Sequence, residues 1–371
     1  MNFRFFMPAD VRAGHDAVRQ NEAVFAALGK SCLIVTSGSA AEKSGALYDV
    51  NTALERQGIE AVSFSGVAQN PTAESCFQAG AIARDFGVDF VVGIGGGSAL
   101  DAAKAAAVFA TNKTLPAEGI FDGGPLLPPL PVVLIGTTAG TGSEVTSVAV
   151  LTRENGCKKS VSGRDYYAKY VLADPRYTDS VPWDVTVSTA LDALAHTAEG
   201  WFSNRFDETA RLFGQKALPV LWRHLASFYE IGEQPLSSET RDELYYASLD
   251  AGMVLNACGT GFPHGMGYVL TEEHGLPHGR ACAALLPAYV ERGMRFRAER
   301  AKAFFAAAGT NFPEFARVVS ALAGTSGVRM TDEQIARYCA RWEGLKNFQN
   351  SPGGYDTAEA GALLQRLFGD A

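Results

Sequence analysis

Asp89-Phe-Val-Val-Gly-Ile-Gly95-Gly96-Gly97-Ser98-Ala-Leu-Asp101-Ala-Ala-Lys104 is the stretch of sequence that decides the fold. An apolar run leads into three glycines and then into an alanine-rich segment, which predicts a strand at 89–94, a turn and a helix at 98–111. Ser98 and Asp101 match a capping pattern that would fix the start of this helix. Glycines let the backbone approach a pyrophosphate closely, and a helix N-terminus offers free N–H groups. The stretch favours a nucleotide-binding unit, although it differs from the G-x-G-x-x-G pattern and many glycine runs mark only turns.

The first half of the chain alternates between apolar strands and helices. Strands are predicted at 31–36, 61–65, 89–94 and 131–136, and helices at 45–57, from Asn70-Pro71 onward and at 98–111. Turns rich in glycine and hydroxyl groups follow two of these strands, at Ser37-Gly38-Ser39 and at 137–146. Strands separated by helices form parallel sheets, which bind ligands at the carboxyl ends of the strands. We therefore expect an α/β dinucleotide-binding domain with a parallel sheet over residues 1–180.

The second half shows helical patterns only, beyond a boundary near 174–181. The predicted helices are 184–203, 207–230, 239–257, 279–307, 311–323, 331–345 and 357–368. We expect an all-α domain over residues 181–371, with the active site in the cleft between the two domains.

A small set of carboxylate and imidazole side chains lies in this second half. Asp192 and His196 stand four residues apart in a helical pattern, so their side chains project from one face. An isolated pair of this kind is usually a surface contact. Two further histidines, His264 and His278, lie in apolar, glycine-flanked surroundings that do not suit solvated side chains. One carboxylate and three imidazoles suit Fe²⁺ or Zn²⁺, so the four residues are predicted metal ligands.

Composition excludes several classes of protein. The chain has 371 residues and a formal net charge of -8, which argues against nucleic acid or an anionic membrane as a partner. No apolar run reaches the ~18 residues of a membrane span, and the start lacks the long apolar region of a signal peptide. The six cysteines show no paired spacing and suit reduced core thiols. We expect a cytoplasmic protein.

These motifs together resemble the iron-containing (group III) alcohol dehydrogenases. The stretch 95–104 is similar to the glycine motif of that family, and 137–146 is similar to its nicotinamide loop. Asp192, His196, His264 and His278 match its four metal-ligand positions. Within the family, the segment 267–271 most resembles the 1,3-propanediol dehydrogenase-like branch. The resemblance implies a dehydroquinate synthase-like architecture, a homodimer, and hydride transfer between a nicotinamide and a short primary alcohol, diol or aldehyde.

The resemblance also implies which residues bind the cofactor. A basic residue should reach it from the 154–159 turn, where Lys159 matches better than Lys158. The full predicted set is Ser37, Gly38, Ser39, Asn70, Gly95, Gly96, Gly97, Ser98, Asp101, Thr137, Thr138, Thr141, Ser143, Val150 and Lys159.

Ser37 bears on the choice between NAD(H) and NADP(H). Relatives that prefer NAD(H) carry an Asp at this position, whose charge repels the extra phosphate of NADP(H). Here the residue is Ser37, with Lys43 nearby as a possible positive charge. We expect NADP(H) to be favoured over NAD(H). The alternative is that Ser37 is only a turn residue and that the protein accepts either cofactor.

Two positions depart from the pattern of the family. Many relatives have a second histidine four residues after the third ligand, and here that residue is Tyr268. We expect Tyr268 to line the pocket, and donation through its hydroxyl is the alternative. His274 is an extra histidine that we expect to lie in a loop rather than to bind the metal. The alternatives are a lyase of the dehydroquinate synthase type and a catalytically silent family member. The absence of Lys and Arg from 256–276 argues against the lyase, and the intact ligand set argues against the silent member.

Overall fold

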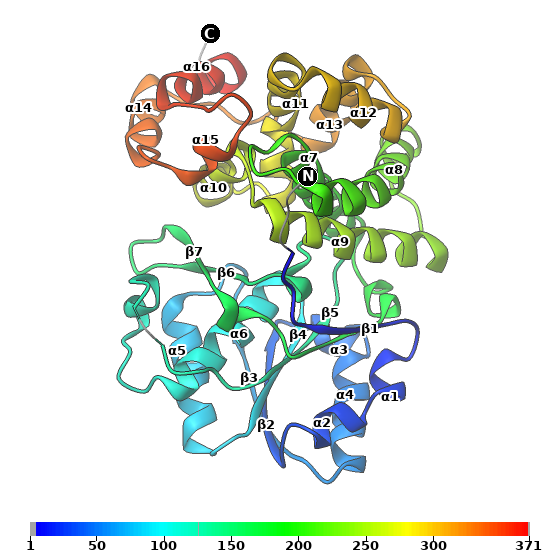
Figure 1. Cartoon of the computed structure of the whole chain (residues 1–371), viewed down its shortest axis with the longest axis vertical. Helices are drawn as coiled ribbons and strands as arrows, with labels where there is room; N and C mark the ends of the chain where they lie inside the picture. Colours follow the sequence, from blue (N-terminus) through cyan, green and yellow to red (C-terminus); the bar gives the residue numbers. More distant parts are fainter. Residues whose placement is uncertain (1–4, 125, 370–371) are drawn as a thin grey trace. The chain divides into compact units, whose positions relative to one another are not determined.

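The computed structural model describes residues 5–124 and 126–369, which divide into two compact units (Figure 1). Phe6–Pro182 together with Leu236–Tyr245 forms an α/β unit. The other described residues form a helical unit. Each unit has its own internal packing.

The α/β unit is built on a six-stranded parallel sheet, as the alternation of strands and helices predicts. Its strand order is β1 (Asp10–Ala13), β8 (Tyr170–Ala173), β5 (Val132–Gly136), β4 (Phe90–Gly95), β2 (Ser31–Ser37) and β3 (Glu60–Val67). The central strands β4 and β5 are buried along their whole length, because helices cover both of their faces. Strands β1 and β8 are too short and too weakly patterned to have been predicted.

Helices lie on both faces of this sheet (Figure 1). One face packs against α1 (Ala17–Gln20), α2 (Ala23–Ala26) and α4 (Ala46–Arg56), with α3 (Ala40–Lys43) beside them. The other packs against α5 (Ala73–Asp85) and α6 (Gly97–Thr111). A Cβ atom at Gly93 would lie 2.6 Å from the Cβ of Ala103, so the absence of a side chain lets α6 approach the sheet. An antiparallel hairpin, β6 (Val148–Thr152) with β7 (Lys158–Ser162), completes the unit.

The predicted cap of α6 is wrong. The helix begins at Gly97 with Gly96 as its N-cap, and no side chain caps it. Ser98 and Asp101 instead bond to other segments: Ser98 Oγ accepts from Asn70 N, and Asp101 accepts from Val150 N. Tertiary partners therefore outcompete the local capping pattern.

The helical unit contains no named strand among its described residues, as predicted. Its helices are α7 (Trp183–Phe202), α8 (Glu208–Ile231), α9 (Ser238–Cys258, which begins in the α/β unit), α10 (Phe262–His274), α11 (His278–Phe296), α12 (Ala298–Ala308), α13 (Phe312–Ala323), α14 (Asp332–Arg341), α15 (Lys346–Asn350) and α16 (Thr357–Phe368). The single helix predicted at 279–307 is two helices, because Arg297 leaves the helical region at φ -141°, ψ 50°. The helix predicted at 331–345 ends at Arg341. No described helix combines the length and apolar character that crossing a membrane requires.

Helix α10 was not predicted. Two of its glycines allow close packing. A Cβ at Gly267 would lie 3.3 Å from the backbone N of Cys282, and one at Gly265 would lie 2.7 Å from Leu345. His274 is the last residue of α10 rather than a loop residue, and Gly275 ends the helix in the left-handed conformation at φ 69°.

Candidate functional site

Helix α7 carries the first two predicted metal ligands on one buried face. Asp192 and His196 are 3% and 4% exposed, and His196 Nε2 lies 4.0 Å from Asp192 Oδ1. A surface pair would keep both groups in water, so their burial argues against the surface-contact alternative.

The other two predicted ligands arrive from the starts of two helices. His264 lies in the first turn of α10 and His278 is the first residue of α11. His264 Nε2 lies 3.4 Å from Asp192 Oδ1, and His278 Nε2 lies 3.8 Å from the same oxygen. The His196 and His264 rings stack with centroids 4.5 Å apart. The structure therefore brings together all four residues that the sequence singled out.

A close contact between α7 and α11 makes this convergence possible. A Cβ at Gly279 would lie 1.8 Å from the carbonyl oxygen of Ser188, so only glycine allows the start of α11 to touch α7 here. His278, the preceding residue, is thereby held over Asp192.

The donor atoms fit a divalent cation. Two nitrogen or oxygen ligands at about 2.0–2.1 Å in a tetrahedral shell lie about 3.3 Å apart. The three donor-to-donor distances given above, 3.4–4.0 Å, are close to that spacing. Asp192 Oδ1 and His264 Nε2 are buried and have no hydrogen-bond partner among the described residues. Burial alone would raise the pKa of Asp192, but the nearby histidines outweigh it and lower that pKa, which keeps the carboxylate ionised.

Glu199 supports His264 and was missed by the sequence analysis. Its side chain is fully buried; Oε1 lies 2.6 Å from His264 Nδ1 and Oε2 accepts a 2.7 Å bond from Gly261 N. A carboxylate in this place holds the proton on Nδ1 and leaves the Nε2 lone pair facing Asp192. Glu199 lies seven residues after Asp192 and three after His196, on the same face of α7, so helical periodicity could have found it.

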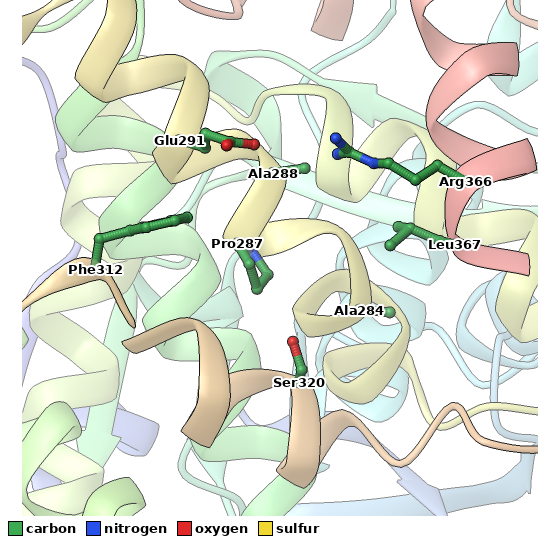
Figure 2. A pocket seen from close by; sticks show the side chains of 8 residues that line it. All are labelled: Ala284, Pro287, Ala288, Glu291, Phe312, Ser320, Arg366 and Leu367. Carbon is green, nitrogen blue, oxygen red and sulfur yellow. The ribbon is translucent and has the colours of Figure 1, made fainter. Parts of the chain in front are cut away.

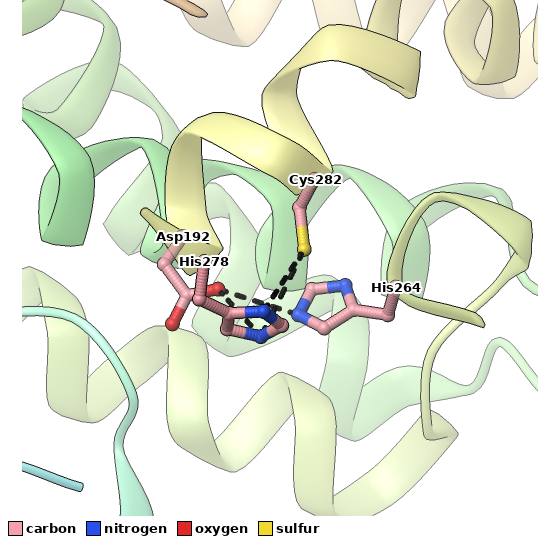
Figure 3. A group of neighbouring side chains, drawn as sticks. All are labelled: Asp192, His264, His278 and Cys282. Carbon is pink, nitrogen blue, oxygen red and sulfur yellow. Dashed lines mark hydrogen bonds and ion pairs between the residues drawn. The ribbon is translucent and has the colours of Figure 1, made fainter. Parts of the chain in front are cut away.

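Cys282 is the second residue that was missed. It lies on α11 four residues after His278, and its Sγ lies 3.8 Å from His278 Nε2 (Figure 3). One donor atom each from Asp192, His264, His278 and Cys282 lies within 4.8 Å of all the others. Burial raises the pKa of the Cys282 thiol to about 11. All six cysteines are free, as expected.

Four apolar or aromatic residues lie near His264 in the sequence: Phe262, Met266, Tyr268 and Val269. Of these four, only Tyr268 is not fully buried. Its ring stacks on His278 with centroids 5.6 Å apart. Phe262, Met266 and Val269 are at most 1% exposed and belong to the core. His274 Nε2 lies 3.5 Å from the hydroxyl of Tyr338 and takes no part in the metal-ligand group.

In the α/β unit, the glycine turn after β4 (95–97) packs against the loop after β5 (137–146). Thr137 N donates a 3.0 Å bond to Gly95 O at the ends of β5 and β4. A Cβ at Gly97 would lie 2.7 Å from the Thr141 side chain, and one at Gly96 would lie 3.3 Å from the side chain of Thr138. These glycines therefore permit the approach of the neighbouring loop, in addition to any role with a phosphate.

Lys104 fixes the loop that follows. Its ammonium group is fully buried and donates to Ser143 O, Ser143 Oγ, Thr146 O and Val148 O at 2.6–3.1 Å. Burial lowers its pKa to about 8, against the raising effect of Asp101 and Glu144. Asp101 in turn accepts a 2.6 Å bond from Ser143 Oγ. Asp101, Ser143 and Val150 therefore form a structural network that shapes the loop.

The remaining predicted cofactor residues differ in what they offer. Ser37 Oγ donates a 2.8 Å bond to Val67 O at the end of β2, whereas Gly38 and Ser39 are exposed. Asn70 adopts a left-handed conformation at φ 61°, which is uncommon outside glycine and marks this turn. Lys159 Nζ lies 5.7 Å from the ring centroid of Phe121.

A further pocket in the helical unit is separate from the ligand group (Figure 2). On α11 its lining begins at Ala284, two residues after Cys282, and it includes none of the residues of the ligand group. The lining residues are Ala284, Pro287, Ala288, Glu291, Phe312, Ser320, Arg366 and Leu367.

A parallel sheet with glycine turns and a helical unit with a buried group of aspartate and histidines are features of metal- and nucleotide-dependent oxidoreductases. Residues 8–175 match the family model "Iron-containing alcohol dehydrogenase", and residues 186–337 match the model "Fe-containing alcohol dehydrogenase family, C-terminal". The chain belongs to the iron-containing alcohol dehydrogenase family, as the motifs predict.

Individual relatives agree. Alcohol dehydrogenase 4 of Schizosaccharomyces pombe is 34% identical over 71% of this chain and 61% of its own length. The 1,3-propanediol dehydrogenase of Klebsiella pneumoniae is 33% identical over 70% of this chain and 67% of its own. The crystal structure of an iron-containing alcohol dehydrogenase from Thermotoga maritima superposes with a TM-score of 0.91, at 32% identity over 99% of both chains. These findings support the dehydrogenase and not the lyase.

Relatives with a named cofactor differ from one another. The NADPH-dependent butanol dehydrogenase of Clostridium saccharobutylicum is 27% identical over 90% of this chain and 81% of its own length. The sulfoacetaldehyde reductase of Bifidobacterium kashiwanohense, solved with NAD+, has a TM-score of 0.86 at 26% identity over 99% of both chains. The names and titles of these relatives therefore include both kinds of nicotinamide cofactor.

Proposed function

We propose that this chain interconverts short, uncharged primary alcohols or diols and their aldehydes, by hydride transfer to or from a nicotinamide cofactor at a divalent metal centre. The observation that carries the proposal is the convergence of buried Asp192, His196 and His264 with half-buried His278 in a member of the alcohol dehydrogenase family. Fe²⁺ is the proposed ion, with Zn²⁺ as the alternative that the same ligands accept.

The residues of the helical unit prepare the reacting end of the substrate. A divalent ion in the centre supplies a Lewis acid for the substrate oxygen. Asp192 contributes the negative charge among the four predicted ligands. Glu199 holds the proton of His264 at Nδ1, so this ring cannot rotate without breaking a buried 2.6 Å bond. Tyr268, stacked on His278, offers an aromatic wall in place of a second titratable histidine.

The α/β unit would bind the nicotinamide cofactor through the turns at the ends of β2, β4 and β5. The proposed contacts are the residues predicted from the sequence, with the N-terminus of α6 directed at the pyrophosphate. NADP(H) remains the proposed preference, because the turn after β2 carries no carboxylate at Ser37, Gly38 or Ser39. We also propose a homodimer in the cytoplasm.

The proposed substrate carries no charge, because no cationic side chain lies in 256–276 beside the ligands. An anionic group bound there would be left unpaired. Turnover of butanal and 3-hydroxypropanal should far exceed that of phosphorylated or carboxylated aldehydes, in steady-state assays on protein of known metal content. Faster turnover of the anionic aldehydes would refute this substrate class.

The centre itself is tested by His264→Ala, with His274→Ala as a matched control on the same helix. His264→Ala should lose metal and activity but still bind the nicotinamide cofactor, since the nucleotide-binding residues belong to the other unit. His274→Ala should retain both metal and activity. Full activity in His264→Ala would refute the ligand assignment.

A further inference from the structure

We propose that Cys282 Sγ is itself a metal ligand, so that the centre offers a thiolate beside the carboxylate and the imidazoles. The proposal rests on the proposed function only in requiring that a divalent ion binds this centre. It adds a donor of a different chemical class, which changes the cations that the centre prefers.

The distances place the sulfur within reach of an ion held by its neighbours. Sγ lies 3.8 Å from His278 Nε2 and belongs to the group of donor atoms that are mutually within 4.8 Å. In a tetrahedral shell with a metal–sulfur bond of about 2.3 Å and a metal–nitrogen bond of about 2.05 Å, these two atoms lie about 3.6 Å apart. A shift of a few tenths of an ångström would therefore complete the contact.

The fold directs the sulfur into the centre. Cys282 lies one turn after His278 on α11, so both side chains leave the same face of the helix. Figure 3 shows the sulfur pointing toward the two imidazoles. A Cβ at Gly267 would lie 3.4 Å from Sγ, so the bare backbone of α10 closes over the sulfur and shields it from water. Cys282 is fully buried.

A second observation, independent of the cysteine, indicates a cation at this place. Asp192 Oδ1 and His264 Nε2 are at least nine-tenths buried and face each other at 3.4 Å, with no hydrogen-bond partner among the described residues. Two such atoms are costly to bury unless a proton or a metal cation lies between them. The sulfur lies within 4.8 Å of a donor atom of each of these two residues.

The chemical consequence is a shift in metal selectivity. Thiolates favour Zn²⁺ over ions that prefer oxygen and nitrogen donors, and Co²⁺ binds similar sites. His196 Nε2, at 4.0 Å from Asp192 Oδ1, is the most distant of the three imidazole nitrogens from that oxygen. We expect Cys282 to take the position beside Asp192, His264 and His278 when Zn²⁺ or Co²⁺ is bound.

Cobalt provides a direct readout, because a thiolate bound to Co²⁺ gives an intense charge-transfer absorption in the near ultraviolet that nitrogen and oxygen ligands lack. The full chain would be freed of metal with a chelator and titrated with Co²⁺. The wild type should develop this absorption, and Cys282→Ala and Cys282→Ser should not. Cys258→Ala is the matched control, because Cys258 is a buried free cysteine of the same unit whose thiol bonds to Arg205 O. It should retain the absorption.

Competition between Zn²⁺ and Fe²⁺ gives the second readout. Loss of a ligand should weaken Zn²⁺ binding by no less than the 10–100-fold that is typical for loss of an outer supporting group. Cys282→Ser should therefore weaken Zn²⁺ at least about tenfold and Fe²⁺ by less.

Co²⁺ bound by the wild type without the charge-transfer absorption would overturn the proposal, as would an absorption that persists in Cys282→Ala. Both results leave the metal centre of the proposed function intact. A wild type that binds no divalent ion would instead overturn that centre, and this proposal with it. The wild-type spectrum alone decides the question if a variant fails to fold.

Discussion

Replacing Glu199 by glutamine should weaken metal binding without touching a predicted ligand. The carboxylate of Glu199 receives two donors, the Nδ1–H of His264 and the backbone N–H of Gly261. Glutamine offers one acceptor and one NH₂ group. The NH₂ group of glutamine must then face one of these two donors in a fully buried place. Either the hydrogen bond from His264 Nδ1 or the one from Gly261 N is therefore lost.

The magnitude follows from these contacts. Loss of the group that orients a metal-binding histidine typically costs 10–100-fold in affinity, which is about 1.4–2.8 kcal/mol. A buried donor left without an acceptor costs about 1–3 kcal/mol of folding stability. The unsatisfied buried donor lowers folding stability whether or not metal is bound. The metal-free variant should therefore unfold at a lower urea concentration than the metal-free wild type.

The assay is a chelator competition that measures the dissociation constant of Zn²⁺ or Co²⁺ for each protein. Asp250→Asn is the matched control: Asp250 is a buried carboxylate on α9 that pairs with Lys216 at 3.0 Å. Its loss should lower stability and leave metal affinity unchanged. If Glu199→Gln binds metal within about twofold of the wild type, the supporting role of Glu199 is refuted.

Three further predictions concern other positions. The kcat/KM ratio of NADPH over NADH should exceed one in the wild type and fall in Ser37→Asp; a wild-type ratio well below one contradicts the NADP(H) preference. Burial raises the pKa of Glu144 to about 7. From pH 4.5 to pH 7 the folded state then binds the proton more tightly than the unfolded state, so Glu144 makes stability fall as the pH rises, by up to about 3 kcal/mol. Glu144→Gln should remove this fall, and parallel curves of urea midpoint against pH for the two proteins would refute it. Gly279→Ala should displace the start of α11 from Ser188 and lower metal affinity at least about tenfold, while Gly327→Ala, at a position with open space, should match the wild type in the same chelator competition.

The sequence predicts the sheet and the convergence of Asp192, His196, His264 and His278 well, for physical reasons. Buried central strands such as β4 must be continuously apolar, so they stand out from their surroundings. Histidine is rare in this chain, with six in total, so three in apolar surroundings are informative. Strand β1 has four residues with an exposed, intermediate, intermediate, exposed pattern, which no periodicity identifies. Its place in the sheet depends on pairing with β8, which is distant in the sequence.

Helix α10 shows why glycines mislead a sequence-based prediction. Glycine lowers helix propensity by about 1 kcal/mol relative to alanine, so Gly265 and Gly267 weaken the helical signal of this segment. In the folded chain the missing side chains let α10 approach Leu345 and the backbone of α11 closely. Packing gained between helices outweighs the local cost, and this packing places His264 against Asp192.

Both missed residues lie on the helical period of a predicted ligand, and this period was followed only from Asp192 to His196. On α7 the period that joins Asp192 to His196 continues to Glu199, which fixes a ligand from the next helix. On α11 the same period joins His278 to Cys282, whose sulfur lies beside the ligand group. A face that holds two ligands in a buried place has little room for a side chain unrelated to the ion, because any polar neighbour must be paired. Following the period of each ligand-bearing helix through two turns would therefore have identified the supporting carboxylate and the thiol from the sequence.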